Sequence, residues 1–271
     1  MKPINQMMSF ICLLLTLSGH MYGRKLSLYM SYGLAFGSKG SGLKGSNSVS
    51  TDLVPSQNHV KYPSIGVGRH MELGADVSVY QNWNVRLTGG YSVTPTLEAS
   101  SSCTGFVDEK SDYTGHVWFG KCLLSYQMPV SFMHFYAGAG LGIFRAMVKR
   151  QVDCQIANQE GDSDYLLNGQ YDFRTAPGFA GHIGIKVPVK GRFQLACELT
   201  FQKVKLSIDQ CKIHTAIRDG ENVLDQIDLD PDKPGSQNAL SFGENKGMMS
   251  QNWQLPGSNV GFRAGLLINI F

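Results

Sequence analysis

The sequence is poor in charge and lacks the motifs of several common protein classes. Only 17% of its 271 residues are Asp, Glu, Lys or Arg, and the formal net charge is +3. No cluster of Lys or Arg is present, so nucleic-acid binding is not expected. The six cysteines include no C-x-x-C pair, which argues against a zinc site or a dithiol redox motif. Beyond residue 23 no run of 18 apolar residues occurs, so a membrane-spanning helix is excluded.

The first 23 residues have the pattern of a secretory signal peptide. Lys2 precedes an apolar run over 10–17, and small residues follow that run. The run is far shorter than the roughly 20 residues that a membrane-spanning helix needs. We therefore expect export of the chain, with 1–23 as the signal peptide and 24–271 as the mature domain.

Eight segments alternate between apolar and polar residues, which is typical of β-strands with two different faces. Their connections alternate between short and long, as in an up-and-down sheet whose short turns all lie at one end. Short turns are expected at 81–84, 129–133 and 188–191, and long polar loops at 38–63, 99–112, 151–172 and 208–257. The eight expected strands are 25–37, 64–80, 84–98, 113–128, 134–150, 173–187, 192–207 and 258–271.

One face of these segments is apolar enough to contact lipid. In the first segment that face holds Leu26, Leu28, Met30, Tyr32, Leu34 and Phe36. Aromatic residues gather near the short turns, where an aromatic belt of a membrane protein would lie: Tyr80, Trp83, Tyr126, Phe132, Phe135, Tyr136 and Phe193. A secreted soluble β-sandwich shows the same alternation, and periodicity alone does not separate the two folds.

The chain resembles the small eight-stranded outer-membrane β-barrel proteins of Gram-negative bacteria, the OmpA-barrel and OmpX-like type. The resemblance is carried by the signal peptide, by "FYAGAGLGIF" (135–144), by "GFAGHIGIKVPV" (178–189) and by the terminal "GLLINIF". It implies an all-β fold, an eight-stranded antiparallel up-and-down transmembrane β-barrel, with long extracellular loops. It also implies a location in the cell outer membrane, in contact with outer-membrane lipids and lipopolysaccharide.

The same resemblance implies insertion by the barrel assembly machinery, because the terminal Phe271 resembles the assembly signal of such proteins. Phe271 shares its phase with the polar residues Asn269 and Arg263. Either a bulge resets the phase near the end of the chain, or Phe271 points inward.

An interior of eight strands is filled by side chains, so an open pore is not expected. The inward phase carries charges of both signs, and a buried charge needs a partner. We expect both acids of 64–80 to lie near Arg86, and Glu198 to lie near Lys186 or Arg263. The predicted lumen ion-pair network, with a stabilising role, comprises Glu72, Asp76, Arg86, Lys186, Glu198 and Arg263.

No catalytic residue, metal site or cofactor is expected. The histidines are scattered, and no spacing marks a nucleophile with its base. Cys103, Cys154 and Cys211 fall in expected loops, where a bridge from Cys154 to either of the other two is possible.

The long loops are the expected functional surface, because long structureless loops on a rigid scaffold are usually functional. The sequence therefore favours a structural or surface-binding protein, which contributes to envelope integrity or adhesion and binds an unspecified extracellular ligand. A narrow solute channel and a lipid-modifying outer-membrane enzyme are the alternatives.

Overall fold

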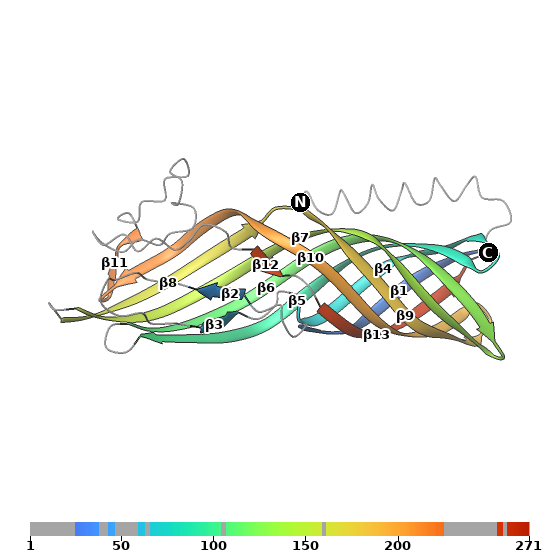
Figure 1. The fold of residues 1–271 in the computed structure, drawn as a ribbon, viewed down its shortest axis with the longest axis horizontal. Coiled ribbons are helices and arrows are strands. Elements are labelled where there is room, and N and C mark those ends of the chain that lie inside the picture. The colour runs from blue at the N-terminus through green and yellow to red at the C-terminus, as the bar shows by residue number, and fades with distance from the viewer. Residues whose placement is uncertain are drawn as a thin grey trace.

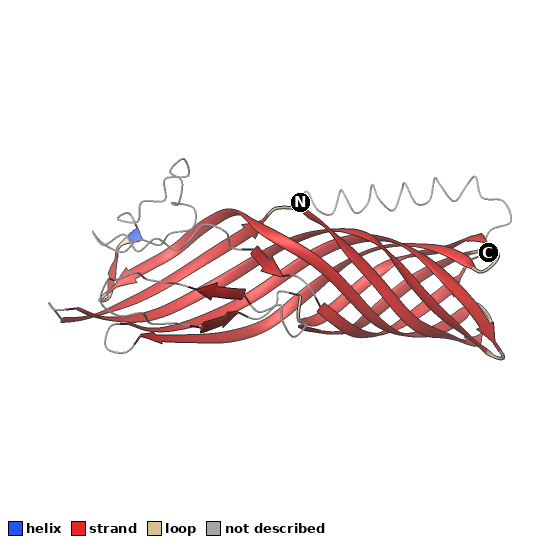
Figure 2. Cartoon of the chain, viewed as in Figure 1, coloured by secondary structure: helices blue, strands red, loops and turns tan. Residues whose placement is uncertain are grey.

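The structure, a computed structural model, describes residues 25–37, 43–46, 59–62, 66–103, 107–158, 161–224, 254–256 and 259–270. These residues form an all-β structure of antiparallel strands (Figures 1 and 2). Within these ranges no helix is long and apolar enough to cross a membrane. The expected signal peptide (1–23) and Phe271 lie outside the described residues.

Eight long strands follow one another up and down. Each pairs with the strand before it and the strand after it, and the last pairs with the first. Every strand of this series therefore has hydrogen-bonded neighbours on both edges, and the predicted antiparallel up-and-down order is confirmed. The strands are β1 (Leu26–Gly37), β4 (Gly68–Tyr80), β5 (Trp83–Cys103), β6 (Val107–Val130), β7 (Met133–Asn158), β9 (Ala176–Lys190), β10 (Phe193–Arg218) and β13 (Asn259–Asn269).

The three predicted short turns are present and lie at the same end of the sheet. Each consists of two residues, at 81–82, 131–132 and 191–192. The first residue of each turn has a left-handed backbone, with φ of 42° at Gln81, 54° at Ser131 and 61° at Gly191. Only the third turn uses glycine for this conformation, so the other two accept a side chain in a region that L-residues seldom adopt.

The expectation of loops at 99–112 and 151–172 is wrong. β5 and β6 stay paired as far as Cys103 and Val107, and β7 continues to Asn158. A further strand, β8 (Gly161–Phe173), returns beside β7 and also pairs with β10. The long strands therefore project as a tall sheet beyond the level at which β1, β4 and β13 end (Figure 1).

Polar outward residues account for this error. The inward residues of the projecting part keep the two-residue period, since Val152, Leu167 and Tyr171 are all buried. The outward positions between them carry residues such as Gln151 and Asn168, so the mean composition is that of a loop. A strand that leaves an apolar environment for water would show this change on its outer face alone.

The other two expected loops also contain strands. Within 38–63, β2 (Leu43–Ser46) pairs with β3 (His59–Tyr62). Within 208–257, β10 continues to Arg218 and a turn leads into β11 (Glu221–Asn222). A short strand, β12 (Gln254–Pro256), lies beside β10.

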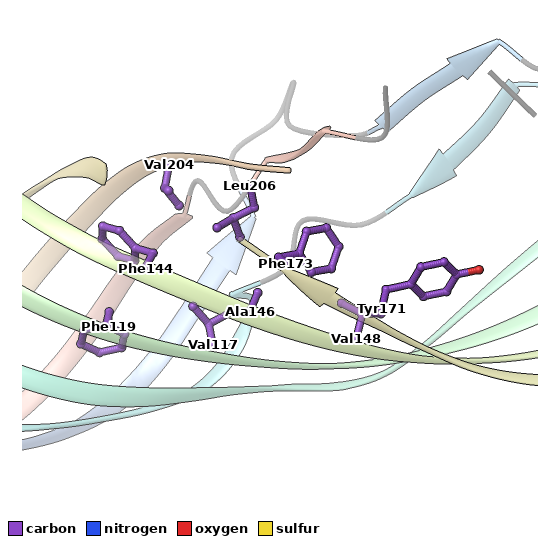
Figure 3. Packing of buried hydrophobic residues seen from close by; sticks show 9 residues of the cluster. All are labelled: Val117, Phe119, Phe144, Ala146, Val148, Tyr171, Phe173, Val204 and Leu206. Carbon is purple, nitrogen blue, oxygen red and sulfur yellow. The ribbon is translucent and has the colours of Figure 1, made fainter. Parts of the chain in front are cut away.

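The interior of the projecting part begins with an apolar cluster. Its side chains come from β6, β7, β8 and β10 and pack against one another (Figure 3). We call this set the upper core: Val117, Phe119, Phe144, Ala146, Val148, Tyr171, Phe173, Val204 and Leu206.

Candidate functional site

Arg86 of β5 lies at the centre of a buried group of charges. Its Nε and Nη2 atoms donate hydrogen bonds to the two carboxylate oxygens of Asp76, at 2.8 and 3.0 Å. Its Nη1 atom donates to Oε1 of Glu198, which comes from β10. Arg86 and Glu198 are each only 1% exposed. One guanidinium thus holds two carboxylates that are far apart in the sequence.

Three further side chains complete this group. Lys186 Nζ donates to Oδ2 of Asp76 at 2.9 Å, so each charge of the group has an opposite partner. The phenols of Tyr29 and Tyr136 donate to the two oxygens of Glu198, at 2.8 and 2.5 Å. The guanidinium carbon of Arg86 also lies 4.1 Å from the centre of the Tyr29 ring, a cation–π contact. The group is therefore balanced in charge, and the Glu198 carboxylate is well solvated by protein donors.

A second buried group surrounds Glu72. Its Oε2 atom accepts a hydrogen bond from Lys121 Nζ at 2.9 Å and another from Arg263 Nη1. The His70 ring lies 3.6 Å from the same oxygen and stacks on Phe119 of the upper core, with the ring centres 4.6 Å apart. The charge groups and the upper core therefore form one continuous packed interior.

The structure brings all six predicted residues together, but with different partners. Arg86 lies beside Asp76 as expected, whereas Glu72 binds Arg263 and Lys121 instead of Arg86. Glu198 binds Arg86, and Lys186 binds Asp76. Glu198 lies opposite Arg263 in the register of β10 and β13, as expected, but its ion pair is with Arg86 and not with Arg263 or Lys186. Side-chain phase identifies the face of a strand, but it does not reveal which residue lies opposite across the interior.

The predicted network omitted three side chains that bond to its carboxylates: Tyr29, Lys121 and Tyr136. Lys121 has the same phase as Leu123 and Ser125, both buried, and alternates with exposed Cys122. That phase was the available signal for Lys121, as it was for Tyr29. Tyr136 was expected in the outer aromatic belt, but it is 3% exposed and points inward, because it alternates with outward Phe135.

A glycine allows Tyr136 to reach Glu198. Gly184 of β9 pairs with Tyr136 on one edge and with Glu198 on the other, so the three residues form one row across the sheet. A Cβ atom on Gly184 would lie 2.8 Å from the Tyr136 hydroxyl oxygen. The missing side chain leaves the space through which the phenol crosses the intervening strand.

The outward face of the same strands is apolar. Twenty-seven large apolar side chains are exposed, which is far more than a soluble monomer leaves in one continuous surface. They include six of the seven residues of the predicted aromatic belt: Tyr80, Trp83, Tyr126, Phe132, Phe135 and Phe193. We call this surface the apolar band.

The two faces exchange their character along the strands. On the part of β10 nearer the short turns, Phe201 points outward and Glu198 inward. Beyond that level Lys203 points outward, and Val204 and Leu206 point inward. The neighbouring β7 changes in the same way, from outward Ile143 to outward Arg145, and its inward residues there belong to the upper core.

The remaining sites considered from the sequence do not converge. His70 and His182 are buried, whereas His116 lies nearer the surface and stacks with Tyr91 and Trp118. Among the residues that the structure describes, no group of three or more His, Cys, Asp or Glu could hold a metal ion.

Cysteine pairing is constrained by the strand order. Cys122 and Cys197 are free and exposed on the apolar band. The side chains of Cys103, Cys154 and Cys211 lie outside the described residues, although their backbones are in β5, β7 and β10. One strand separates each candidate pair, since β6 pairs with β5 and β7, and β8 pairs with β7 and β10. Cys103 and Cys154 are also offset by two residues along β6, and Cys154 and Cys211 by six residues along β8. Both backbone distances therefore exceed roughly 10 Å, which is too long for either bridge.

Comparison with known proteins gives distant structural similarities alone. No protein-family model and no curated protein sequence matches the chain. A major outer membrane protein from Thermus thermophilus has a TM-score of 0.46 and 8% identity, with 92% of this chain and 100% of that chain covered. Neisserial surface protein A has a TM-score of 0.38 and 10% identity, with 92% and 97% covered. A deltaS2S3 mutant of the TodX monoaromatic hydrocarbon channel has a TM-score of 0.19 and 10% identity, with 94% and 92% covered. These values do not assign the chain to a family.

The central ion pair predicts a large stability loss for Glu198→Gln. The variant keeps the side-chain volume but leaves Arg86 buried with one carboxylate, which it shares with Lys186. We expect the free energy of unfolding to fall by about 3 kcal/mol, measured by urea unfolding in detergent micelles. Asp209→Asn is the matched control, because its partner Arg174 is exposed and such pairs contribute less than about 1 kcal/mol. Equal unfolding midpoints for Glu198→Gln and the unaltered chain would contradict a stabilising role.

Proposed function

We propose that the ring of eight paired strands is a closed β-barrel that spans the outer membrane of a Gram-negative cell. In this proposal the chain is a structural and surface-binding component of the envelope, and it has no enzymatic activity. The projecting sheet lies outside the cell and provides the binding surface.

The observation that carries this proposal is the exchange of character between the two faces. Near the short turns, charges such as Arg86 are buried and residues such as Leu199 are 58% exposed, the reverse of a soluble protein. Further along, outward cations such as Arg145 and Lys203 are exposed and the upper core is buried, as in a soluble protein. A change of solvent from lipid to water along each strand accounts for both halves.

The height of the apolar band supports a membrane span. On β1 its outward apolar residues run from Leu28 to Phe36, and on β10 from Phe193 to Phe201. Each series covers about 27 Å along the strand. At a strand tilt of about 40° this is roughly 21 Å of height, close to the roughly 25 Å of membrane barrels.

The interior favours a plugged barrel over a channel. Arg86 and Lys121 are 1% and 5% exposed, and both are bonded to carboxylates inside the ring. An interior of eight strands is only wide enough for side chains. A narrow channel is the alternative, because charged residues line the same interior.

A heat-dependent gel shift tests the barrel and its location. We expect the protein in the outer-membrane fraction, with faster migration in SDS when unheated than when boiled. The reason is that a closed hydrogen-bonded barrel has no free edge at which detergent unfolding begins. Recovery in the soluble fraction, or the same migration with and without boiling, would contradict the membrane barrel and favour the soluble β-sandwich.

Epitope insertion tests the orientation. A tag after Asp219, in the turn between β10 and β11, should bind antibody on intact cells, because this turn lies at the projecting end. A tag after Ser131, in a short turn, should bind only after the outer membrane is permeabilised. The reverse pattern would put the projecting sheet in the periplasm and remove the surface-binding role.

Planar-bilayer recording separates the plug from the channel. We expect no sustained conductance from the purified, heat-modifiable protein, since the buried ion pairs fill the interior. The conductance of Glu198→Gln is recorded for comparison, because this variant breaks the Arg86–Glu198 ion pair at the centre of the interior. Steady single-channel currents from the unaltered protein would favour the narrow-channel alternative.

A further inference from the structure

Directly beyond the apolar band, the outward faces of β7 and β10 become cationic. These two strands lie on either side of β9. On β7, Arg145 follows Ile143, and Lys149 lies two outward positions beyond Arg145, after Met147. On β10, Lys203 and Lys205 follow Phe201. All four side chains are exposed. We call these four residues the basic patch.

The strand pairings bring the two halves of the basic patch close together. β9 pairs with β7 on one edge and β10 on the other, and its Phe179 lies opposite both Leu141 and Lys203. Further along, Gln170 of β8 lies opposite both Lys149 and Lys212. Adjacent strands are about 4.8 Å apart, and Lys205 lies two residues from the level of Arg145. These two cations, the nearest pair across the sheet, are therefore separated by about 12 Å. One ligand with two anionic groups could contact both strands.

Two acidic residues of this region are paired with other cations, and exposed Asp112 of β6 lies diagonally beside Lys149. Arg174 Nε donates to Asp209 Oδ1 at 3.0 Å, and Lys212 Nζ lies 3.7 Å from Asp172 Oδ2. These two carboxylates satisfy cations beside the basic patch. Among the described residues, no carboxylate pairs with any of its four members. The patch therefore carries a net positive charge at the surface.

We propose that the basic patch binds the phosphorylated headgroup of an outer-leaflet glycolipid. This inference rests on the proposed membrane insertion. Arg and Lys side chains donate charge-assisted hydrogen bonds to phosphate oxygens. The acyl chains of the same molecule lie against the apolar band immediately below, at Phe179 and Phe201, which are 66% and 45% exposed. A water-soluble phosphate would make only the first of these two interactions, so the geometry selects a lipid.

Native mass spectrometry of the full mature chain in detergent tests this inference. The probe is diphosphoryl lipid A, compared with phosphatidylethanolamine at equal concentration. We expect lipid A to be retained preferentially. Its apparent affinity should fall at least about tenfold in the quadruple variant Arg145→Gln, Lys149→Gln, Lys203→Gln and Lys205→Gln. Binding to the unaltered protein should also weaken with added salt.

A variant with three cations removed at the opposite end is the matched control. Lys25→Gln, Lys190→Gln and Arg192→Gln alter exposed residues near the short turns and should leave lipid A binding unchanged. Equal losses in both variants would overturn the inference. Inorganic phosphate that displaces lipid A at comparable concentration would also overturn it, because the site would then select any phosphate.

The gel shift distinguishes failure of this inference from failure of the proposed function. If the unaltered chain shows no heat-dependent shift, the membrane barrel itself is wrong. If all variants shift and bind lipid A equally, only the basic patch is wrong. Should the quadruple variant not shift, the double variants on β7 alone and on β10 alone are measured, and each is expected to lose part of the affinity.

Discussion

The interior of this protein depends on Arg86, whose guanidinium is held between Asp76 and Glu198. Asp76 is on the adjacent strand, but Glu198 is on β10, which shares no backbone hydrogen bond with β5. A buried charge without its partner is costly, so this pair forms only when the two halves of the sheet face each other. The bond from Arg263 to Glu72 links β13 to β4 in the same way. Ion pairs thus connect strands that the backbone ladder leaves separate.

Space for these long side chains comes from small inward residues between them. Gly184 lets the Tyr136 phenol cross to Glu198, and Gly33 pairs with Arg263 where a Cβ atom would overlap the arginine. Large side chains and glycines therefore lie next to one another in the interior, as close packing requires. Gly184 and Gly33 are thus explained by the side chains of the charge groups beside them.

Much of this arrangement could be predicted from the sequence, and the limits have physical causes. All eight ring strands and the three short turns followed from the two-residue period, and the same period identified Arg86 and Glu198 as inward. Asp76, on the strand adjacent to Arg86, was correctly expected as its partner. The bond between Arg86 and Glu198 could not be predicted, because contacts across an interior depend on the shear of the whole ring. The projecting strands were missed because water-facing residues such as Gln151 made them resemble loops. Tyr136 was assigned by its nearness to a turn, although its alternation with Phe135 indicated the inward face.

The exchange of character along β7 and β10 is also what one sheet would need in order to be stable in the two surroundings of the proposed function. Nearer the short turns, lipid would solvate the outer face, so polar groups are confined to the interior and must satisfy one another. Beyond the apolar band, water solvates the outer face, and the upper core supplies the hydrophobic burial that a soluble sheet needs. The backbone ladder runs without interruption from β6 to β7 through both regions. Continuous pairing therefore joins the projecting sheet directly to the apolar band, and in the proposed function it would hold the binding surface at a set height above the membrane.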